Sequence, residues 1–132
     1  MYDRILVPLK GDRTDEAVVA HTGSLAKMSG GVVFLLRVLH AHSRDEAAFL
    51  EEQARTYLDG QVARLAAEGV AAEGRVTTGE PAPAIVAAAR ELGADLVVMA
   101  THGHREMRHL LMGSVTEDVV RSGIVPVLLV RP

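Results

Sequence analysis

Four short segments of the chain are almost wholly aliphatic and lack the alternation of apolar and polar positions that a half-exposed strand shows. They span residues 4–9, 31–39, 95–100 and 125–130. Strands that are buried on both faces of a parallel sheet have this pattern. A weaker segment, residues 70–79, mixes apolar with polar residues, which predicts a shallower strand at an edge of the sheet.

The stretches between these segments have the three- and four-residue apolar spacing of amphipathic helices. The first helix is predicted to start at Asp12 or Thr14 and to run to about Lys27, closed by Gly30 and Gly31. The third is predicted between a proline-containing first turn at residues 81–83 and a glycine at position 93.

Two segments, residues 43–46 and 114–117, have the form of a capping box. In this motif a Ser hydroxyl and a Glu side chain three residues later each satisfy a backbone N–H at a helix start. The first box precedes a long helix whose apolar positions fall on one face: Ala47, Leu50, Ala54, Tyr57, Leu58, Val62 and Leu65. The second box predicts that the last helix begins with Ser114 as its cap.

Strands and helices therefore alternate along the whole chain, which predicts an α/β fold. Five parallel strands joined by right-handed crossovers place helices on both faces of the sheet, in a Rossmann-like arrangement. With 132 residues, and no linker or repeat, residues 1–132 are expected to form a single domain.

Composition excludes several classes of protein. The formal charge of −3, from 14 basic and 17 acidic residues, argues against non-specific nucleic-acid binding. Without cysteine there are no disulfides and no thiolate ligands. The apolar runs are too short to span a bilayer and no signal-like segment precedes the first strand, so a cytoplasmic protein without a membrane partner is expected.

Candidate chemistry is concentrated between the fourth strand and the last helix. Ligands of open α/β sheets bind beyond the carboxyl ends of the strands. Gly103 and Gly113 permit close backbone approach, and the helix start offers unpaired N–H groups at Ser114, Val115 and Thr116. These features predict a phosphate site. The loop between them adds positive charge from His104, Arg105, Arg108 and His109.

This loop resembles the nucleotide loop of the universal stress protein family, whose motif is Gly, two residues, Gly, nine residues, Gly and then Ser or Thr. Ala100, Gly103, Gly113 and Ser114 occupy these places. The segments "RILVPLKG", "TTGEPAPAIVAAARELGADLVVMATHG" and "SGIVPVLLVRP" resemble other parts of the family. The resemblance implies the sheet order 3-2-1-4-5 of the adenine nucleotide alpha hydrolase-like fold, ATP or AMP as ligand, with or without Mg²⁺, and a homodimer.

The resemblance also implies which residues would bind, with Val38 near the adenine. The nucleotide-binding positions are Leu9, Lys10, Val38, Ala100, Thr101, Gly103, His104, Arg105, Gly113, Ser114, Val115 and Thr116. The dimer would pair the last strands of two chains, through Val125, Val127, Leu128, Leu129 and Val130.

Two positions depart from the family pattern. Ala100 replaces the first glycine of the motif, a small change that leaves the turn possible. Lys10 replaces an Asp that accepts hydrogen bonds from the nucleoside, and an ammonium group has no acceptor. Lys10 thus leaves three possibilities open: weakened nucleotide binding, a more anionic ligand, or no nucleotide.

Structural explanations also exist for the histidines and for Ser114. The four histidines His40, His42, His102 and His104 invite a metal site, but zinc sites usually add a carboxylate or thiolate, and no metal is predicted. Ser114 is expected to cap its helix rather than act as a nucleophile.

The favoured function is a regulatory nucleotide-binding protein with unidentified protein partners. An interaction module without nucleotide and a weak ATP hydrolase are the alternatives.

Overall fold

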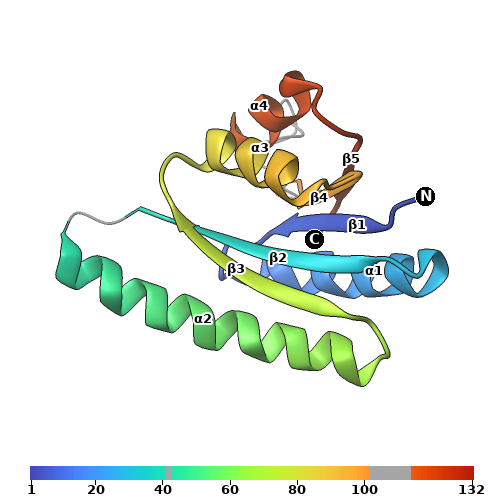
Figure 1. The fold of residues 1–132 in the computed structure, drawn as a ribbon, viewed down its shortest axis with the longest axis horizontal. Coiled ribbons are helices and arrows are strands. Elements are labelled where there is room, and N and C mark those ends of the chain that lie inside the picture. Colours follow the sequence, from blue (N-terminus) through green and yellow to red (C-terminus); the bar gives the residue numbers. More distant parts are fainter. Residues whose placement is uncertain (41–42, 102–113) are drawn as a thin grey trace.

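In a computed structural model, which describes residues 1–40, 43–101 and 114–132, the chain forms one five-stranded parallel sheet. The sheet order is β3-β2-β1-β4-β5, which confirms the order implied by the family resemblance (Figure 1). The strands are β1 (Arg4–Pro8), β2 (Val32–Leu39), β3 (Ala72–Thr78), β4 (Leu96–Ala100) and β5 (Val127–Val130). The helices are α1 (Thr14–Ser29), α2 (Arg44–Ala67), α3 (Pro81–Leu92) and α4 (Ser114–Ser122).

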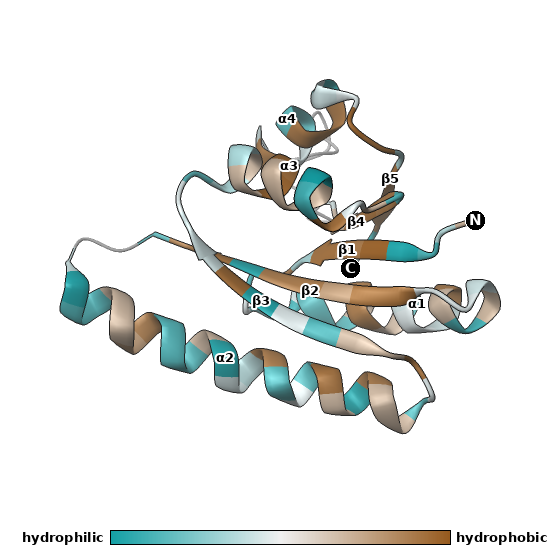
Figure 2. Cartoon of the chain, viewed as in Figure 1, coloured by the Kyte–Doolittle hydropathy of each residue, from teal (hydrophilic) through white to brown (hydrophobic). Residues whose placement is uncertain are grey.

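Helices α1 and α2 cover one face of the sheet, and α3 and α4 cover the other (Figure 1). Within β1, Ile5 and Val7 pack toward α1 and α2, whereas Leu6 packs toward α3 and α4. Both faces of the central strands are buried, which explains why their sequences are apolar throughout. Figure 2 shows apolar colouring along most of β1, whereas α2 alternates between apolar and hydrophilic residues.

The two edge strands, β3 and β5, are less buried than the central strands of the sheet. Strand β3 is half-buried or exposed along its length, as predicted for a shallower edge. It is held against α2 at Gly74, where a Cβ would lie 3.0 Å from the Leu58 side chain. Strand β5 forms the opposite edge, and Val127, Leu128 and Leu129 in it are half-buried.

The last strand is shorter than predicted, because it begins at Val127 instead of residue 125. Pro126 lacks an N–H group for the ladder, and its carbonyl accepts a hydrogen bond from the Val97 N–H at 3.0 Å. Val125 therefore precedes the strand in which it was predicted.

The helix ends agree with the capping signals except in detail. Helix α1 begins at Thr14, whose N–H donates to the Asp12 carboxylate at 2.9 Å, and it runs to Ser29, beyond the predicted end at Lys27. Gly30 closes it in the left-handed region, at φ +76°. Ser43 caps α2 as predicted, its hydroxyl accepting from the Glu46 N–H at 3.1 Å.

None of the helices in the described ranges is long and apolar enough to cross a lipid bilayer.

Candidate ligand-binding pocket

A cavity of about 350 Å³ opens at the carboxyl ends of β1, β2 and β4. The sheet order reverses between β1 and β4, and ligands of α/β sheets bind at such a reversal. The starts of α3 and α4 complete the walls. The lining residues are Pro8, Leu9, Lys10, Asp15, Leu36, Arg37, Val38, Pro81, Ile85, Met99, Ala100, Ser114, Val115 and Thr116.

Most of the predicted binding residues that the structure describes meet in this cavity. They are Leu9, Lys10, Val38, Ala100, Ser114, Val115 and Thr116. Thr101 does not line it, and its N–H donates to the Val130 carbonyl at 2.9 Å. The other four predicted positions, Gly103, His104, Arg105 and Gly113, lie outside the described residues.

One wall of the cavity is the first turn of α4. Ser114 is exposed, Val115 is half-buried and Thr116 is buried. The helix is described from Ser114 onward and the residue before it lies outside the described residues, so the Ser114 cap stays a prediction. The Glu117 carboxylate accepts from Arg121 one turn later, at 2.6 Å. The first N–H groups of this helix lack intrahelical partners, and with the helix dipole they favour an anion.

The middle of the cavity is apolar. Leu36 and Val38 contribute from β2, Ile85 from α3 and Met99 from β4. The volume and the mixture of apolar walls with a few polar groups are typical of small-molecule sites. A flat apolar group such as a nucleobase fits such a slot, with its polar substituents directed toward the rim.

Asp15, which no sequence pattern singled out, is a buried acid of this region, with 3% of its surface exposed. One carboxylate oxygen accepts from the Lys10 N–H at 2.9 Å. The other accepts from the Gly11 N–H and from the Tyr57 hydroxyl, both at 2.7 Å. Asp15 therefore holds the loop between β1 and α1 in place. From the sequence, an acid in a first helical turn predicts only a favourable contact with the helix dipole. The bond to Tyr57 could not be predicted, because Tyr57 is far from Asp15 in the sequence.

The environment of Tyr57 reinforces this arrangement. Burial raises the pKa of the Tyr57 hydroxyl, and the hydrogen bond to Asp15 raises it further. The phenol therefore remains a neutral donor, which is the form that the Asp15 carboxylate requires. Through this bond the long helix α2 is tied to the pocket loop.

Positive charge gathers on the same loop. The Arg37 guanidinium donates to the Leu9 carbonyl at 3.2 Å. It also lies against Gly11, where a Cβ would be 3.3 Å from the guanidinium carbon. The hydrogen bond from the Thr14 hydroxyl lowers the pKa of Asp12, and the charges of Lys10 and Arg37 act in the same direction. Gly11 has φ +78°, a conformation that glycine adopts without strain.

Within residues 1–40, 43–101 and 114–132, no three His, Cys, Asp or Glu side chains are grouped so that they could hold a metal ion. Of the histidines considered from the sequence, His40 is described, whereas His42, His102 and His104 lie outside the described residues.

A parallel α/β sheet with a pocket at its point of reversal defines the class of doubly wound, ligand-binding α/β domains. Within this class, the model of the universal stress protein family matches residues 1–131. The chain belongs to the universal stress protein family.

Individual relatives agree with this assignment. Universal stress protein G of Escherichia coli O157:H7 is 31% identical, and the match covers 99% of this chain and 100% of the relative. The solved structure of MJ0577 is similar with a TM-score of 0.88 and 27% identity, over 100% of this chain and 97% of that chain. A universal stress protein in complex with cAMP has a TM-score of 0.78 and 26% identity, over 98% and 97% of the two chains.

Proposed function

We propose that this protein binds an adenine nucleotide, AMP or ATP, in the pocket between β1 and β4 and acts as a dimeric regulatory protein of the cytoplasm. The observation that carries the proposal is that an apolar slot and the first turn of α4 line one cavity. A base needs the first feature and a phosphate needs the second. The similar universal stress protein in complex with cAMP supports adenine as the base.

In the proposed complex, the base packs between Val38 and Met99, with Ile85 beneath it. The phosphates accept hydrogen bonds from the first amides of α4, at Ser114, Val115 and Thr116. Ala100 leaves room for the ligand at the end of β4. The motif residues outside the described ranges complete the phosphate site in this proposal, and Mg²⁺ accompanies the ligand when it is ATP.

The proposed role is binding, and bound nucleotide would bias a surface recognised by protein partners. A weak ATP hydrolase is the alternative. Chromatography of ATP incubated with the protein separates the two, because a regulatory protein leaves the ATP intact over many binding lifetimes.

Direct binding tests the proposal. One sample of the purified protein is denatured, and any released nucleotide is identified by absorbance and mass. A second, folded sample freed of nucleotide is titrated with AMP and ATP by calorimetry. Val38→Trp fills the slot and should abolish binding, whereas Val86→Trp on the outer groove of α3 should bind like the parent. If neither nucleotide is released or bound, the protein is an interaction module of the same fold that takes no nucleotide.

The dimer is proposed from the β5 edge of the sheet. An edge strand with half-buried apolar side chains on both faces invites pairing with another chain. Antiparallel pairing of β5 with its copy would cover Val127, Leu128 and Leu129, with Val125 and Val130 at the ends of the contact. Leu128→Lys should give a monomer by light scattering, and Thr78→Lys on the opposite edge should remain dimeric. A dimeric Leu128→Lys protein would place the interface elsewhere.

A further inference from the structure

The pocket carries positive features at two places in its lining. The start of α4 lies beside β4, whereas Lys10 and Arg37 belong to the β1 and β2 side. Strand β1 separates β2 from β4 in the sheet. Neighbouring strands lie about 4.8 Å apart, so Lys10, which follows β1, lies about one strand spacing from β4, and Val38 on β2 lies about two. Across the sheet, Lys10 therefore stands between the Val38 side of the apolar slot and the start of α4.

The ammonium of Lys10 is available for a ligand. Lys10 is exposed and lines the pocket, and its backbone N–H is held by Asp15. Within the described ranges, no hydrogen bond or ion pair engages its side chain. Lysine binds phosphate as a point charge at the end of a flexible stem.

The acids nearby are already engaged. Asp15 accepts three hydrogen bonds through its two oxygens. Asp12 accepts from both the N–H and the hydroxyl of Thr14. Arg37 uses one nitrogen on the Leu9 carbonyl. The loop between β1 and α1 thus presents Lys10 to the pocket, whereas Asp12 and Asp15 bond to backbone N–H groups, Thr14 and Tyr57.

We infer that the pocket is built for an adenine nucleotide with a second phosphate, on the 2′ or 3′ hydroxyl of its ribose. The inference rests on the proposed function, since it assumes that adenine fills the slot and the 5′ phosphate lies on α4. With the base against Val38 on β2 and the 5′ phosphate at α4 beside β4, the ribose lies over the end of β1, and its own phosphate meets Lys10. Dinucleotide-binding folds follow the same chemistry, with an acid for a free ribose hydroxyl and a cation for a ribose phosphate.

The test compares three ligands by calorimetry: AMP, adenosine 2′,5′-bisphosphate and adenosine 3′,5′-bisphosphate. One of the bisphosphates should bind at least about tenfold more tightly than AMP, as expected for one charge-assisted contact. Lys10→Met should reduce the preference to near one, and Lys10→Asp should reverse it. The control is Lys27→Met, which removes the other lysine of the chain, paired with Glu68 at 3.2 Å and outside the pocket. It should keep the parental preference.

The outcomes separate this inference from the proposed function. If AMP and both bisphosphates bind equally in the parent, the inference is overturned while nucleotide binding stands. It is also overturned if Lys10→Met weakens ATP relative to AMP without changing the bisphosphate preference, because Lys10 would then meet the 5′ phosphate chain. If no adenine compound binds, the proposed function fails and the inference fails with it.

Discussion

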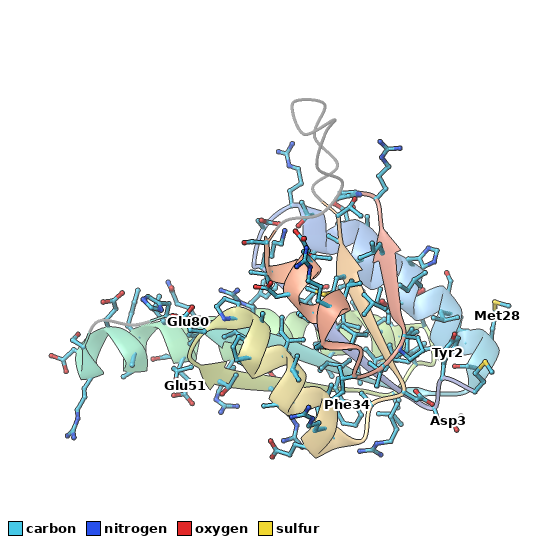
Figure 3. The ribbon with its side chains drawn as sticks, turned by 90° about the horizontal axis from the view of Figure 1, so that it is seen from above. Tyr2, Asp3, Met28, Phe34, Glu51 and Glu80 are labelled. Atoms are coloured by element: carbon cyan, nitrogen blue, oxygen red, sulfur yellow. The ribbon has the colours of Figure 1, made fainter. Side chains whose placement is uncertain are left out.

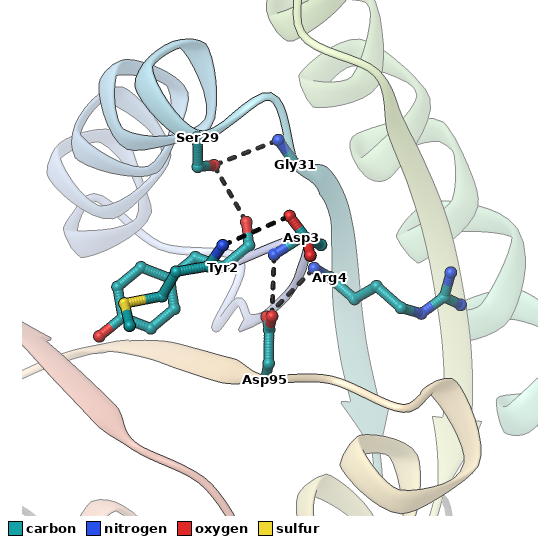
Figure 4. A network of polar contacts seen from close by, with 7 residues as sticks. Tyr2, Asp3, Arg4, Ser29, Gly31 and Asp95 are labelled. Carbon is teal, nitrogen blue, oxygen red and sulfur yellow. Dashed lines mark hydrogen bonds and ion pairs between the residues drawn. The ribbon is translucent and has the colours of Figure 1, made fainter.

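Strand β1 is held at each end by an aspartate that accepts two consecutive backbone N–H groups. At its start, Asp95 accepts from the N–H groups of Asp3 and Arg4, at 2.9 and 3.1 Å (Figure 4). Beyond its end, Asp15 accepts from those of Lys10 and Gly11, at 2.9 and 2.7 Å. The hydrogen-bond pattern is the same, but Asp15 is buried whereas Asp95 is half-buried.

Asp95 stands at the amino end of the sheet, in an exposed polar network with Ser29 and the first residues of the chain (Figure 4). Figure 3 shows this end, marked by Tyr2, Asp3 and Met28, on the side of the molecule opposite Glu51 and Glu80. Asp15 is buried, bonds to Tyr57 of α2 and lines the cavity. The same carboxylate contact thus fixes the start of β1 at one end of the sheet and positions part of the cavity wall at the other.

The largest expected difference between the two ends is in stability after removal of each carboxylate. Asp15→Ala leaves two loop N–H groups and the Tyr57 hydroxyl without their acceptor, at a cost of about 2–4 kcal/mol in the free energy of unfolding. It should also weaken nucleotide binding, because the loop loses its position. Urea unfolding and calorimetry measure both effects. A variant as stable as the parent would show that Asp15 does not organise this loop.

A smaller effect is expected from Tyr57→Phe, which removes only the donor from α2 and should cost about 1–2 kcal/mol. Because the folded state raises the pKa of Tyr57 above the ordinary value of 10.0, the unfolded state releases its proton first as the pH rises. The stabilisation is therefore complete below pH 10 and is lost above it.

Urea unfolding across alkaline pH checks this sign. The parent should lose stability more steeply above pH 10 than Tyr57→Phe does. Equal slopes would mean that Tyr57 titrates normally and that its bond to Asp15 does not form in solution.

The smallest effect is expected at the amino end. Asp95→Asn should cost less than about 1 kcal/mol, because Asp95 is only half-buried, its hydrogen bonds to Asp3 and Arg4 are exposed, and water can replace the lost contacts. Partial burial raises the pKa of Asp95, but the backbone hydrogen bonds from Asp3 and Arg4 outweigh it, so the net pKa lies below 3.8. The contribution is present above that pH and is lost as the pH falls through the lower pKa. An NMR titration of the Asp95 carboxyl measures this directly, and a midpoint above 3.8 would contradict it.

The sequence was sufficient to predict the fold because local signals and burial agreed. Continuous apolar strands, the Ser43 cap and the Gly30 stop are each local patterns that the structure confirms. Pro126 was visible as well, but the strand was still extended across it to Val125. A proline near a strand start is permitted, so only the neighbouring strand decides where pairing begins.

The candidate site was predictable in part. The region follows from the rule that ligands bind at the carboxyl ends of strands, and the helix start pointed to Ser114, Val115 and Thr116. Val38 was implied only by the family resemblance. Asp15 and Arg37 were missed because their partners are set by tertiary packing. Tyr57 reaches Asp15 from a separate helix, and Arg37 reaches the Leu9 carbonyl from a neighbouring strand. Within a single sequence, each looked like an ordinary helix or strand residue.

The central claim is that the carboxyl end of the sheet binds an adenine nucleotide and the amino end does not. The most direct measurement is an NMR titration of the ¹⁵N-labelled protein with AMP, following backbone amides at both ends. The account predicts saturating shifts, with one common affinity, at Lys10, Val38 and Val115, and none at Asp3 or Asp95. Shifts confined to the amino end, or no shifts at millimolar AMP, would contradict it.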